Sequence, residues 1–288
     1  MTTIAGKTIL LTGASRGIGA CIAGELAKQQ AIVVGVSRSK AELERVCADI
    51  RTTGGKAIAI PGDISQVEQL STLVKEIEDR VGSIDILINN AGIEIYRAFP
   101  DYSLAQIQSV LSVNLIAAME LTRLVLPTML RQHSGHIVNI ASLGSKKGHP
   151  YDSAYSASKA GLLVWADALR QELADTEVEI SSICPGYIAD CGMFADTGIP
   201  APSLAGMSKS QDVARAVVRA IAQNRAEIIV NGGLITENLT KLLLAIEQFF
   251  PRLGDSVNRW LDVPKLNQMR IKSIDNSKKS DRQLSSIK

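Results

Sequence analysis

The 288-residue chain lacks a strong net charge, paired cysteines and long apolar runs. With a formal charge of only +2, it has no field that would direct the whole molecule toward nucleic acid. Its cysteines lie far apart, without the CxxC pairs of a zinc or redox site, at Cys21, Cys47, Cys184 and Cys191. Apolar runs such as residues 242–246 are far shorter than the roughly 20 residues that span a bilayer. Because no secretory signal is present at the N-terminus, we expect a cytoplasmic protein in a reducing compartment.

Histidine is scarce as well. His133, His136 and His149 do not have metal-ligand spacing, and no acidic cluster accompanies them, so the sequence predicts no metal site. The overall composition is that of an ordinary globular protein, with 46% apolar and 21% charged residues. A chain of this length can hide most of its unfolded surface in one core, which allows a single large domain.

Short apolar segments alternate with longer helical patterns along the chain. Strands are expected at residues 8–12, 31–37, 57–60, 84–88, 136–140, 179–184 and 227–231. Helices are expected at residues 17–29, 39–53, 65–81, 104–131, 153–176 and 209–224. Ser65 and Glu68 have the spacing of a capping box at the start of the third helix. Most strands are continuously apolar, which is typical of a sheet covered on both faces. The pattern predicts an α/β fold, a doubly wound Rossmann-type parallel sheet of about seven strands, with helices on both faces, in a single domain.

The pattern changes near residue 234. We expect the Rossmann domain to cover residues 1–234, a helical extension to cover 235–271, and a disordered basic tail to cover 272–288. The apolar face of a helix at 237–250, with the basic residues beyond it, fits an anionic membrane surface. It equally fits packing on the same domain or across a subunit interface, and the sequence leaves these alternatives open. The irregular segment 187–208 is typical of a lid or binding loop.

The first expected strand ends in a glycine-rich turn, which reads Thr12-Gly-Ala-Ser-Arg-Gly-Ile-Gly19. Gly13, Gly17 and Gly19 allow the backbone to turn tightly and to approach a pyrophosphate at the N-terminus of the following helix. Strand, turn and helix occur in the order that such a site requires. The segment therefore predicts a dinucleotide-binding turn.

Further motifs stand at the ends of later strands, as Asn89-Asn-Ala-Gly92, Tyr155-Ser-Ala-Ser-Lys159 and Pro185-Gly186. With the glycine turn, their order over residues 5–232 resembles that of the short-chain dehydrogenase/reductase family. The resemblance implies nicotinamide-dependent oxidoreductase activity, and it maps the catalytic tetrad of the family onto Asn114, Ser142, Tyr155 and Lys159. It also implies that Lys159 binds the nicotinamide ribose, that Ser142 holds the substrate oxygen, and that Asn114 helps to hold a water in a proton relay.

The chemistry of Tyr155 and Lys159 can be argued from their spacing. Four residues apart on a helix, their side chains share one face. A phenol has a pKa near 10, and lowering that pKa by ~3 units takes roughly 4 kcal/mol of preferential phenolate stabilisation. A neighbouring ammonium and an oxidised nicotinamide are charges of the required sign. We expect Tyr155 to protonate a carbonyl oxygen in reduction and to accept the proton in oxidation, while hydride moves between the nicotinamide and the carbonyl carbon.

The end of the second strand predicts which nicotinamide cofactor binds. An NAD enzyme usually has a carboxylate there, whereas this sequence has Ser37 and Arg38. Arg38 and Arg16 would attract the 2′-phosphate of NADP, so we expect NADP (NADPH), with NAD less favoured. Asp63 matches the adenine-binding Asp of the family, but it equally fits a cap of the turn before Ser65. The expected cofactor-binding residues are Gly13, Ser15, Arg16, Gly17, Ile18, Gly19, Ser37, Arg38, Asp63, Ile64, Asn90, Ala91, Gly92, Tyr155, Lys159, Pro185, Gly186 and Ile188.

Substrate contacts are expected from residues 94–100, 143–152 and 187–207, which are mainly apolar and favour a hydrophobic ketone, aldehyde or alcohol. The candidate contacts are Ser142, Leu143, His149, Tyr187, Met193 and Phe194. His149 either lines the pocket or is an exposed loop histidine, and the second is the commoner situation. Asp190 stands where the family often has a Thr that binds the nicotinamide carboxamide. A carboxylate can accept there but cannot donate like a hydroxyl, which puts this anchor in doubt.

These observations predict an NADP-dependent oxidoreductase acting on a carbonyl/hydroxyl pair of a small molecule. Two alternatives remain, namely an NADP-binding scaffold or regulatory protein with vestigial activity, and a non-redox epimerase or dehydratase of the same fold. The complete tetrad disfavours the first, and the absence of a long substrate domain disfavours the second. By analogy with the family we expect a homodimer or homotetramer without a nucleic-acid partner, with peripheral membrane contact through the extension as an open alternative.

Overall fold

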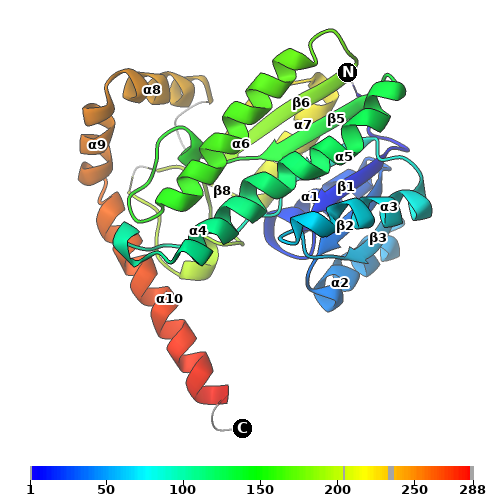
Figure 1. Ribbon diagram of the computed structural model, residues 1–288. Coiled ribbons are helices and arrows are strands. Elements are labelled where there is room, and N and C mark those ends of the chain that lie inside the picture. Colours follow the sequence, from blue (N-terminus) through cyan, green and yellow to red (C-terminus); the bar gives the residue numbers. More distant parts are fainter. Residues whose placement is uncertain (1, 204, 233–236, 286–288) are drawn as a thin grey trace.

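Seven parallel strands form the central sheet, as the apolar segments predicted (Figure 1). The computed structural model describes residues 2–203, 205–232 and 237–285. In spatial order the strands are β3 (Lys56–Pro61), β2 (Ile32–Ser37), β1 (Thr8–Thr12), β4 (Ile86–Asn89), β5 (Gly135–Ile140), β6 (Val178–Pro185) and β9 (Glu227–Val230). The chain builds outward from β1 to β3 and then returns to β4, so the strand order reverses between β1 and β4. Open parallel sheets bind ligands outside the carboxyl ends of the strands at such a reversal.

Helices cover both faces of this sheet (Figure 1). One face carries α1 (Gly17–Lys28), α2 (Lys40–Thr52) and α7 (Ser210–Gln223). The other face carries α3 (Leu70–Val81), α5 (Ala117–Arg131) and α6 (Ser153–Glu172). Because both faces are covered, β1 and β5 are buried at every position, which explains why apolar residues are consecutive in β1 and why the polar His136 and Asn139 of β5 are buried too.

One continuous helical stretch, Leu104–Arg131, is long and apolar enough by length and composition to cross a membrane. It consists of α4 (Leu104–Leu111), a π-helical turn (Ser112–Ile116) and α5. In the structure α5 lies on the sheet, where Leu121 and Val125 are buried in the core. Packing against the sheet therefore accounts for the buried apolar residues of α5, whereas Ile116 and Met119 remain exposed.

The start of the third helix differs from the prediction. A capping box at Ser65 and Glu68 was expected, but α3 begins only at Leu70, after a short 3₁₀ turn, and no side chain caps it. The carboxylate of Asp63 accepts a hydrogen bond from the backbone N–H of Ser65 at 3.0 Å. This local bond stabilises a turn at Ser65, where the prediction placed the first cap of a helix.

The C-terminal extension consists of α8 (Glu237–Phe249), α9 (Pro251–Trp260) and α10 (Val263–Ser285) and curves around one side of the molecule (Figure 1). The composition predicts disorder from residue 272, whereas α10 continues to Ser285, and residues 286–288 lie outside the described residues. The first residues of this segment make tertiary contacts. Ser273 donates to the carbonyl of Thr197 at 2.9 Å, and Asp275 forms an ion pair with Arg97 at 3.3 Å. Packing of this kind favours a helix at residues 273–275 in spite of their polar surroundings in the sequence.

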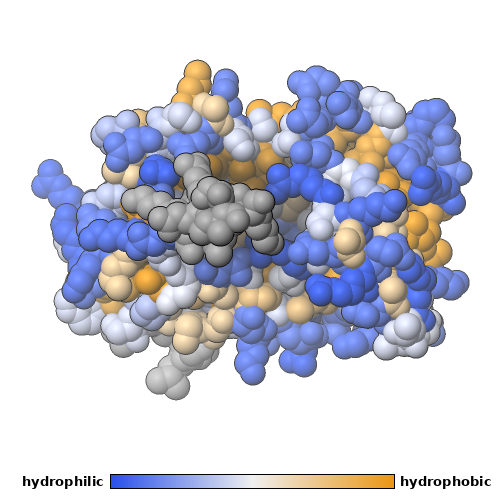
Figure 2. Space-filling view, turned by 90° about the horizontal axis from the view of Figure 1, so that it is seen from below, coloured by the Kyte–Doolittle hydropathy of each residue, from blue (hydrophilic) through white to orange (hydrophobic). Residues whose placement is uncertain are grey.

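Several apolar side chains of the extension remain exposed. On α8, α9 and the residue between them they are Leu239, Leu242, Leu243, Ile246, Phe249, Phe250, Leu253 and Trp260. Leu244 instead packs against the buried Ile229 of β9, so the amphipathic helix is only partly covered by its own domain. The face seen from below in Figure 2 is mostly hydrophilic, with smaller apolar areas between the polar side chains.

Candidate active site

A cavity of about 720 Å³ opens at the carboxyl edge of the sheet, where the strand order reverses. Its lining comes from the segments that follow six of the strands and from the C-terminal extension. Every cofactor-binding and substrate-binding residue expected from the sequence lines this cavity, and within the tetrad only Asn114 does not. Motifs that are scattered along the chain form one site because the crossovers bring all the strand ends to one edge.

The glycine turn is shaped for the close approach of another group to the backbone. Gly13 and Gly17 have φ angles of +68° and +58°, in the left-handed region that favours glycine. At Gly19 a Cβ would stand 2.0 Å from the carbonyl oxygen of Gly13, so a larger residue does not fit without a shift of the backbone. The side chain of Asn90 closes the turn by donating to the carbonyls of Thr12 at 2.9 Å and Gly13 at 3.2 Å. The N-terminus of α1 follows directly, and its free N–H groups suit an anion.

The two arginines expected to bind a 2′-phosphate differ in their surroundings. Arg38 is exposed just after β2, and within the described part of the chain it has no ion-pair partner. Arg16 forms an ion pair with Asp196 at 2.7 Å, which already offsets part of its charge. The hydroxyl of Ser37 is buried and has no hydrogen-bond partner among the described residues. An unpaired guanidinium next to an unsatisfied hydroxyl fits a phosphate, whose oxygens accept from both.

Ser142, Tyr155 and Lys159 meet on one wall of the cavity. Lys159 and Tyr155 share a face of α6, with the lysine Nζ 5.9 Å from the centre of the phenol ring. Ser142 follows β5, and its hydroxyl lies close enough to the Tyr155 phenol to lower the pKa of that phenol. The Lys159 Nζ donates to the carbonyl of Ile140 at 2.7 Å, which holds the long side chain against the end of β5. The three expected groups therefore belong to one site.

The surroundings of Tyr155 do not by themselves make its phenol acidic. Burial raises the pKa of Tyr155, the carboxyl groups of Glu94 and Asp152 raise it further, and the hydrogen bond with Ser142 lowers it. Burial also lowers the pKa of Lys159 to about 8. The lysine alone therefore does not provide the acidification that its spacing suggested. The positive ring of an oxidised nicotinamide is the further charge of the required sign.

Asn114 lies behind the cavity wall, in the π-helical turn, where it is 1% exposed. Its amide oxygen accepts from the N–H of Ile93 at 2.8 Å, and its amide nitrogen donates to the carbonyl of Ile93 and to the hydroxyl of Ser158 at 2.9 Å each. These bonds join the loop after β4 to α6, the helix that holds Tyr155. The side chain of Asn114 thus ties together two walls of the site.

Aromatic rings line the part of the cavity assigned to substrate. His149 stacks on Tyr187 with 6.4 Å between ring centres and an angle of 8°, and Tyr187 contacts Phe194 at 4.8 Å. Leu143 and Met193 complete the expected set. The sequence left two alternatives for His149, and the commoner of them, an exposed loop histidine, is wrong. The ring is half-buried in the cavity wall. Burial lowers its pKa to about 4, so the ring is neutral at pH 7.

Asp190 is engaged by α7. Its carboxylate accepts from the backbone N–H and the hydroxyl of Ser210, at 2.9 and 2.8 Å. It therefore stabilises the start of α7, and it does not line the cavity. Ile188 and Cys191, its neighbours in sequence, line the cavity instead.

The C-terminal extension supplies a wall of the cavity that no sequence motif indicated, with Leu244, Glu247, Val257, Asn258, Leu261 and Asn267. Next to this wall, Arg270 of α10 is fully buried. Its guanidinium donates to the carbonyl of Pro200 at 2.9 Å and lies 5.0 Å from the centre of the Phe194 ring. The apolar spacing at 237–250 was the available indication of packing. Nothing marked Arg270, because arginine is mostly exposed in proteins.

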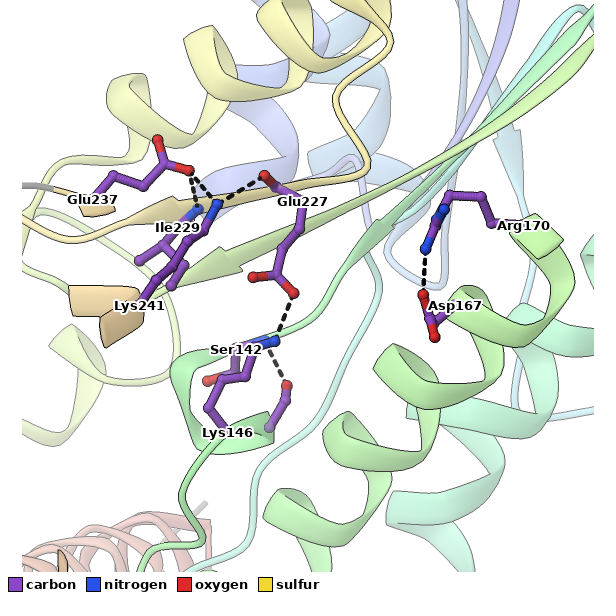
Figure 3. Close-up of polar contacts among 9 residues, drawn as sticks. Ser142, Lys146, Asp167, Arg170, Glu227, Ile229, Glu237 and Lys241 are labelled. Carbon is purple, nitrogen blue, oxygen red and sulfur yellow. Dashed lines mark hydrogen bonds and ion pairs between the residues drawn. The ribbon is translucent and has the colours of Figure 1, made fainter. Parts of the chain in front are cut away.

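Polar contacts connect this extension to the strand ends (Figure 3). Glu237 of α8 accepts from the N–H of Ile229 in β9 at 3.4 Å. At the start of the same strand, Glu227 forms an ion pair with Lys146 at 2.6 Å. Because Lys146 lies in the loop that begins at Ser142, this loop is linked through β9 to α8.

Comparison with known proteins decides the family. The short chain dehydrogenase family is matched by residues 7–198, two thirds of the chain. The chain belongs to the short-chain dehydrogenase/reductase family. Ketoacyl reductase HetN of Nostoc sp. is 56% identical over 273 residues, which cover 95% of this chain and 95% of that protein. The 3-oxoacyl-[acyl-carrier-protein] reductase of Synechocystis sp. is 36% identical over 190 residues, covering 66% of this chain and 77% of the relative.

Solved structures of short-chain dehydrogenases/reductases have the same fold. A metagenomic short-chain oxidoreductase in complex with NADP superimposes with a TM-score of 0.70 at 29% identity, over 81% of this chain and 100% of that one. A short-chain dehydrogenase/reductase from Burkholderia phymatum in complex with NAD has a TM-score of 0.72 at 25% identity, over 80% and 90% of the two chains. The protein is therefore an NAD(P)-dependent oxidoreductase, and membership of the family does not decide between the two nucleotides.

Proposed function

We propose that the protein is an NADPH-dependent reductase of apolar carbonyl compounds, with the 3-oxo group of an acyl thioester as the favoured substrate. The observation that carries the proposal is the meeting of Ser142, Tyr155 and Lys159 on a cavity that also contains the glycine turn and an aromatic wall. The relative that is 56% identical is named a ketoacyl reductase, which supports this substrate class.

The chain's own groups then have the following roles. Bound NADPH supplies the hydride that forms the new C–H bond at the carbonyl carbon. The hydroxyl of Ser142 donates to the carbonyl oxygen and holds it beside Tyr155. Tyr155 gives its proton to that oxygen, so the ketone becomes a secondary alcohol. The ammonium of Lys159 stabilises the phenolate left on Tyr155 until a proton returns to it. Such general acid catalysis contributes typically 10²- to 10⁴-fold.

The preference for NADPH over NADH rests on Arg38. Its guanidinium is exposed at the position where an NAD enzyme usually has a carboxylate, and the hydroxyl of Ser37 precedes it. A planar guanidinium binds a phosphate with parallel hydrogen bonds, whereas the 2′-hydroxyl of NADH offers it no negative charge.

Exposed apolar side chains support contacts beyond the single chain. Ile116, Met119 and Val164 are exposed on the helices of one sheet face, where a second subunit of a homodimer or homotetramer would cover them. The exposed apolar side chains of α8 and α9 are the surface that we propose for peripheral membrane contact of this cytoplasmic protein.

The loss of NADPH absorbance with a panel of carbonyl compounds, including an acetoacetyl thioester, tests the proposal. Turnover of the thioester is expected, and Tyr155→Phe is expected to lower it by roughly 10²- to 10⁴-fold while NADPH binding remains. Net NADPH consumption separates this reaction from epimerisation, which consumes none. Tight NADPH binding without turnover of any carbonyl compound would instead support a scaffold protein.

A further inference from the structure

Two carboxyl groups outside the catalytic tetrad lie beside Tyr155. Glu94 is in the loop after β4 and lines the cavity. Asp152 immediately precedes α6, three residues before Tyr155, and is 0% exposed. A carboxyl group is almost never fully buried in a protein unless it is paired, so the position of Asp152 requires a partner.

Asp152 occupies the N-cap of α6 without capping it. An Asp at this position normally accepts a hydrogen bond from an N–H of the first helical turn, whereas Asp152 makes no such bond. Both of its carboxylate oxygens are buried, and the described residues offer them no N–H or hydroxyl donor. The Glu94 carboxyl group is within hydrogen-bonding reach. Because two ionised carboxylates are both acceptors, a bond between them requires one proton.

The surroundings place that proton on Asp152. Burial raises the pKa of Asp152 well above its ordinary value, and the charge of Glu94 raises it further. Burial raises the pKa of Glu94 too, but hydrogen bonds from Tyr96 and Asp152 and the charge of Arg270 lower it. Asp152 is fully buried and neither of its oxygens has a donor in the described part of the chain that would stabilise an ionised carboxylate, whereas Glu94 lines the open cavity; the proton therefore belongs on Asp152 and the negative charge on Glu94.

The negative charge of the pair acts on Tyr155. The charge of Glu94 opposes ionisation of the phenol. The other groups that face the phenol are the Lys159 ammonium on α6, the Ser142 hydroxyl after β5 and the Cys184 thiol on β6.

The pair is itself faced by charges from other elements. Arg270 approaches from α10, with its guanidinium 5.7 Å from the centre of the Tyr96 ring. Burial and the two carboxyl groups raise the pKa of Tyr102, and the charge of Arg97 lowers it. His149, which lies near Arg270, is neutral at pH 7 and adds no charge. Arg270, on α10, thus offsets part of the charge of the pair.

We propose that Glu94 and Asp152 form a carboxyl pair that shares one proton, and that its remaining negative charge keeps Tyr155 protonated and biases the site toward carbonyl reduction. The inference rests on the proposed function. Reduction needs the phenol as proton donor, and oxidation needs the phenolate as acceptor. A negative charge beside the phenolate disfavours it, so the pair extends reduction to higher pH and slows oxidation at a given pH. Both carboxyl groups act through Tyr155 and are positioning residues.

The test compares the pH dependence of kcat/KM in the two directions, with an acetoacetyl thioester and NADPH and with a 3-hydroxybutyryl thioester and NADP⁺. Glu94→Gln removes the charge and keeps the shape. The pH at which reduction declines and the pH at which oxidation rises should both fall by about one unit, and oxidation on its rising limb should gain about tenfold. Asp152→Asn keeps a donor toward Glu94, so its shift should be smaller.

Glu237→Gln is the matched control, because Glu237 is a half-buried carboxylate on α8 that does not line the cavity. We expect it to leave both pH profiles where they are. Unmoved profiles in Glu94→Gln, or an equal shift in Glu237→Gln, would overturn the proposal.

A second measurement does not depend on the substrate. The chain has five tyrosines, so ¹³C labelling at Cζ gives few resonances, and Tyr155→Phe identifies the one of interest. In the NADP⁺ complex, the Tyr155 resonance should titrate about one pH unit lower in Glu94→Gln than in the wild type. Equal titration would overturn the inference even if no carbonyl compound turned over, whereas missing turnover with this shift intact would overturn only the proposed function. Should Glu94→Gln not fold, Asp152→Asn replaces it in this titration, where a shift toward higher pH would contradict the proposal.

Discussion

Replacement of Arg38 by Ala should weaken the binding of NADPH much more than that of NADH. Arg38 is exposed after β2 and has no ion-pair partner in the described ranges, so its full charge is available to a 2′-phosphate. A hydrogen bond to a charged group contributes about 2 kcal/mol, within a range of roughly 1.5–3 kcal/mol. Losing it should raise the Kd for NADPH by roughly 30-fold. NADH lacks the phosphate, and its Kd should change little.

Arg16 provides an internal comparison for Arg38. Its guanidinium already pairs with Asp196 at 2.7 Å, with both side chains about half exposed. Arg16→Ala should therefore weaken NADPH binding less than Arg38→Ala does. Asp196→Asn should strengthen NADPH binding, because it frees the Arg16 charge for the phosphate. Both effects should shrink as salt is added, since exposed charges are screened.

The assay is a fluorescence titration of each purified variant with NADPH and with NADH, at low and at high salt. The ratio of the Kd for NADH to the Kd for NADPH reports on the phosphate contact alone, because damage to the rest of the site changes both values. An equal loss for both nucleotides, or no loss in Arg38→Ala, would refute the assignment of Arg38 to the 2′-phosphate.

Three further changes test other parts of the structure. Gly19→Ala puts a Cβ 2.0 Å from the Gly13 carbonyl and should lower NADPH affinity by at least roughly tenfold in the same titration, whereas Gly24→Ala, with nothing within 4 Å, should not. Burial lowers the pKa of His136 to about 4, while the unfolded chain takes up that proton near pH 6.5. The free energy of unfolding should thus fall by about 3 kcal/mol as the pH drops from 6.5 to 4, and denaturant titrations of His136→Asn should show a flatter dependence. Arg270→Ala removes the contacts with Phe194 and Pro200, so limited proteolysis should cut α10 before the sheet domain; equal protection in the wild type and the variant would contradict this.

The sheet could be predicted because its determinants are local. Strands such as β1 and β4 contain three consecutive apolar residues, a pattern that is expected where both faces of the sheet are covered. The glycine turn was equally readable, since the positive φ angles of Gly13 and Gly17 are a property of the turn itself. The helix start at Ser65 was misplaced, because a capping box and a turn closed by Asp63 involve the same few residues and only the folded chain shows which one forms.

Long-range partners decided the rest of the site. Asp190 could be recognised as unusual, but only the packing of α7 shows that Ser210 engages it. Arg270 stands in a polar helical segment, and its burial depends on rings that precede it by more than 70 positions along the chain. The same holds for Glu94 and Asp152, which are ordinary loop acids until α10 and the two loops close around them.

The sequence by itself determined the order of the strands and helices, the nucleotide-binding turn and the shared helix face of Tyr155 and Lys159. These features depend on backbone geometry and on spacings of a few residues. Only the tertiary structure decided the charge around Tyr155 and the wall that the C-terminal helices add to the cavity. Electrostatic energy depends on distance in space and on burial, and neither can be obtained from separation along the chain.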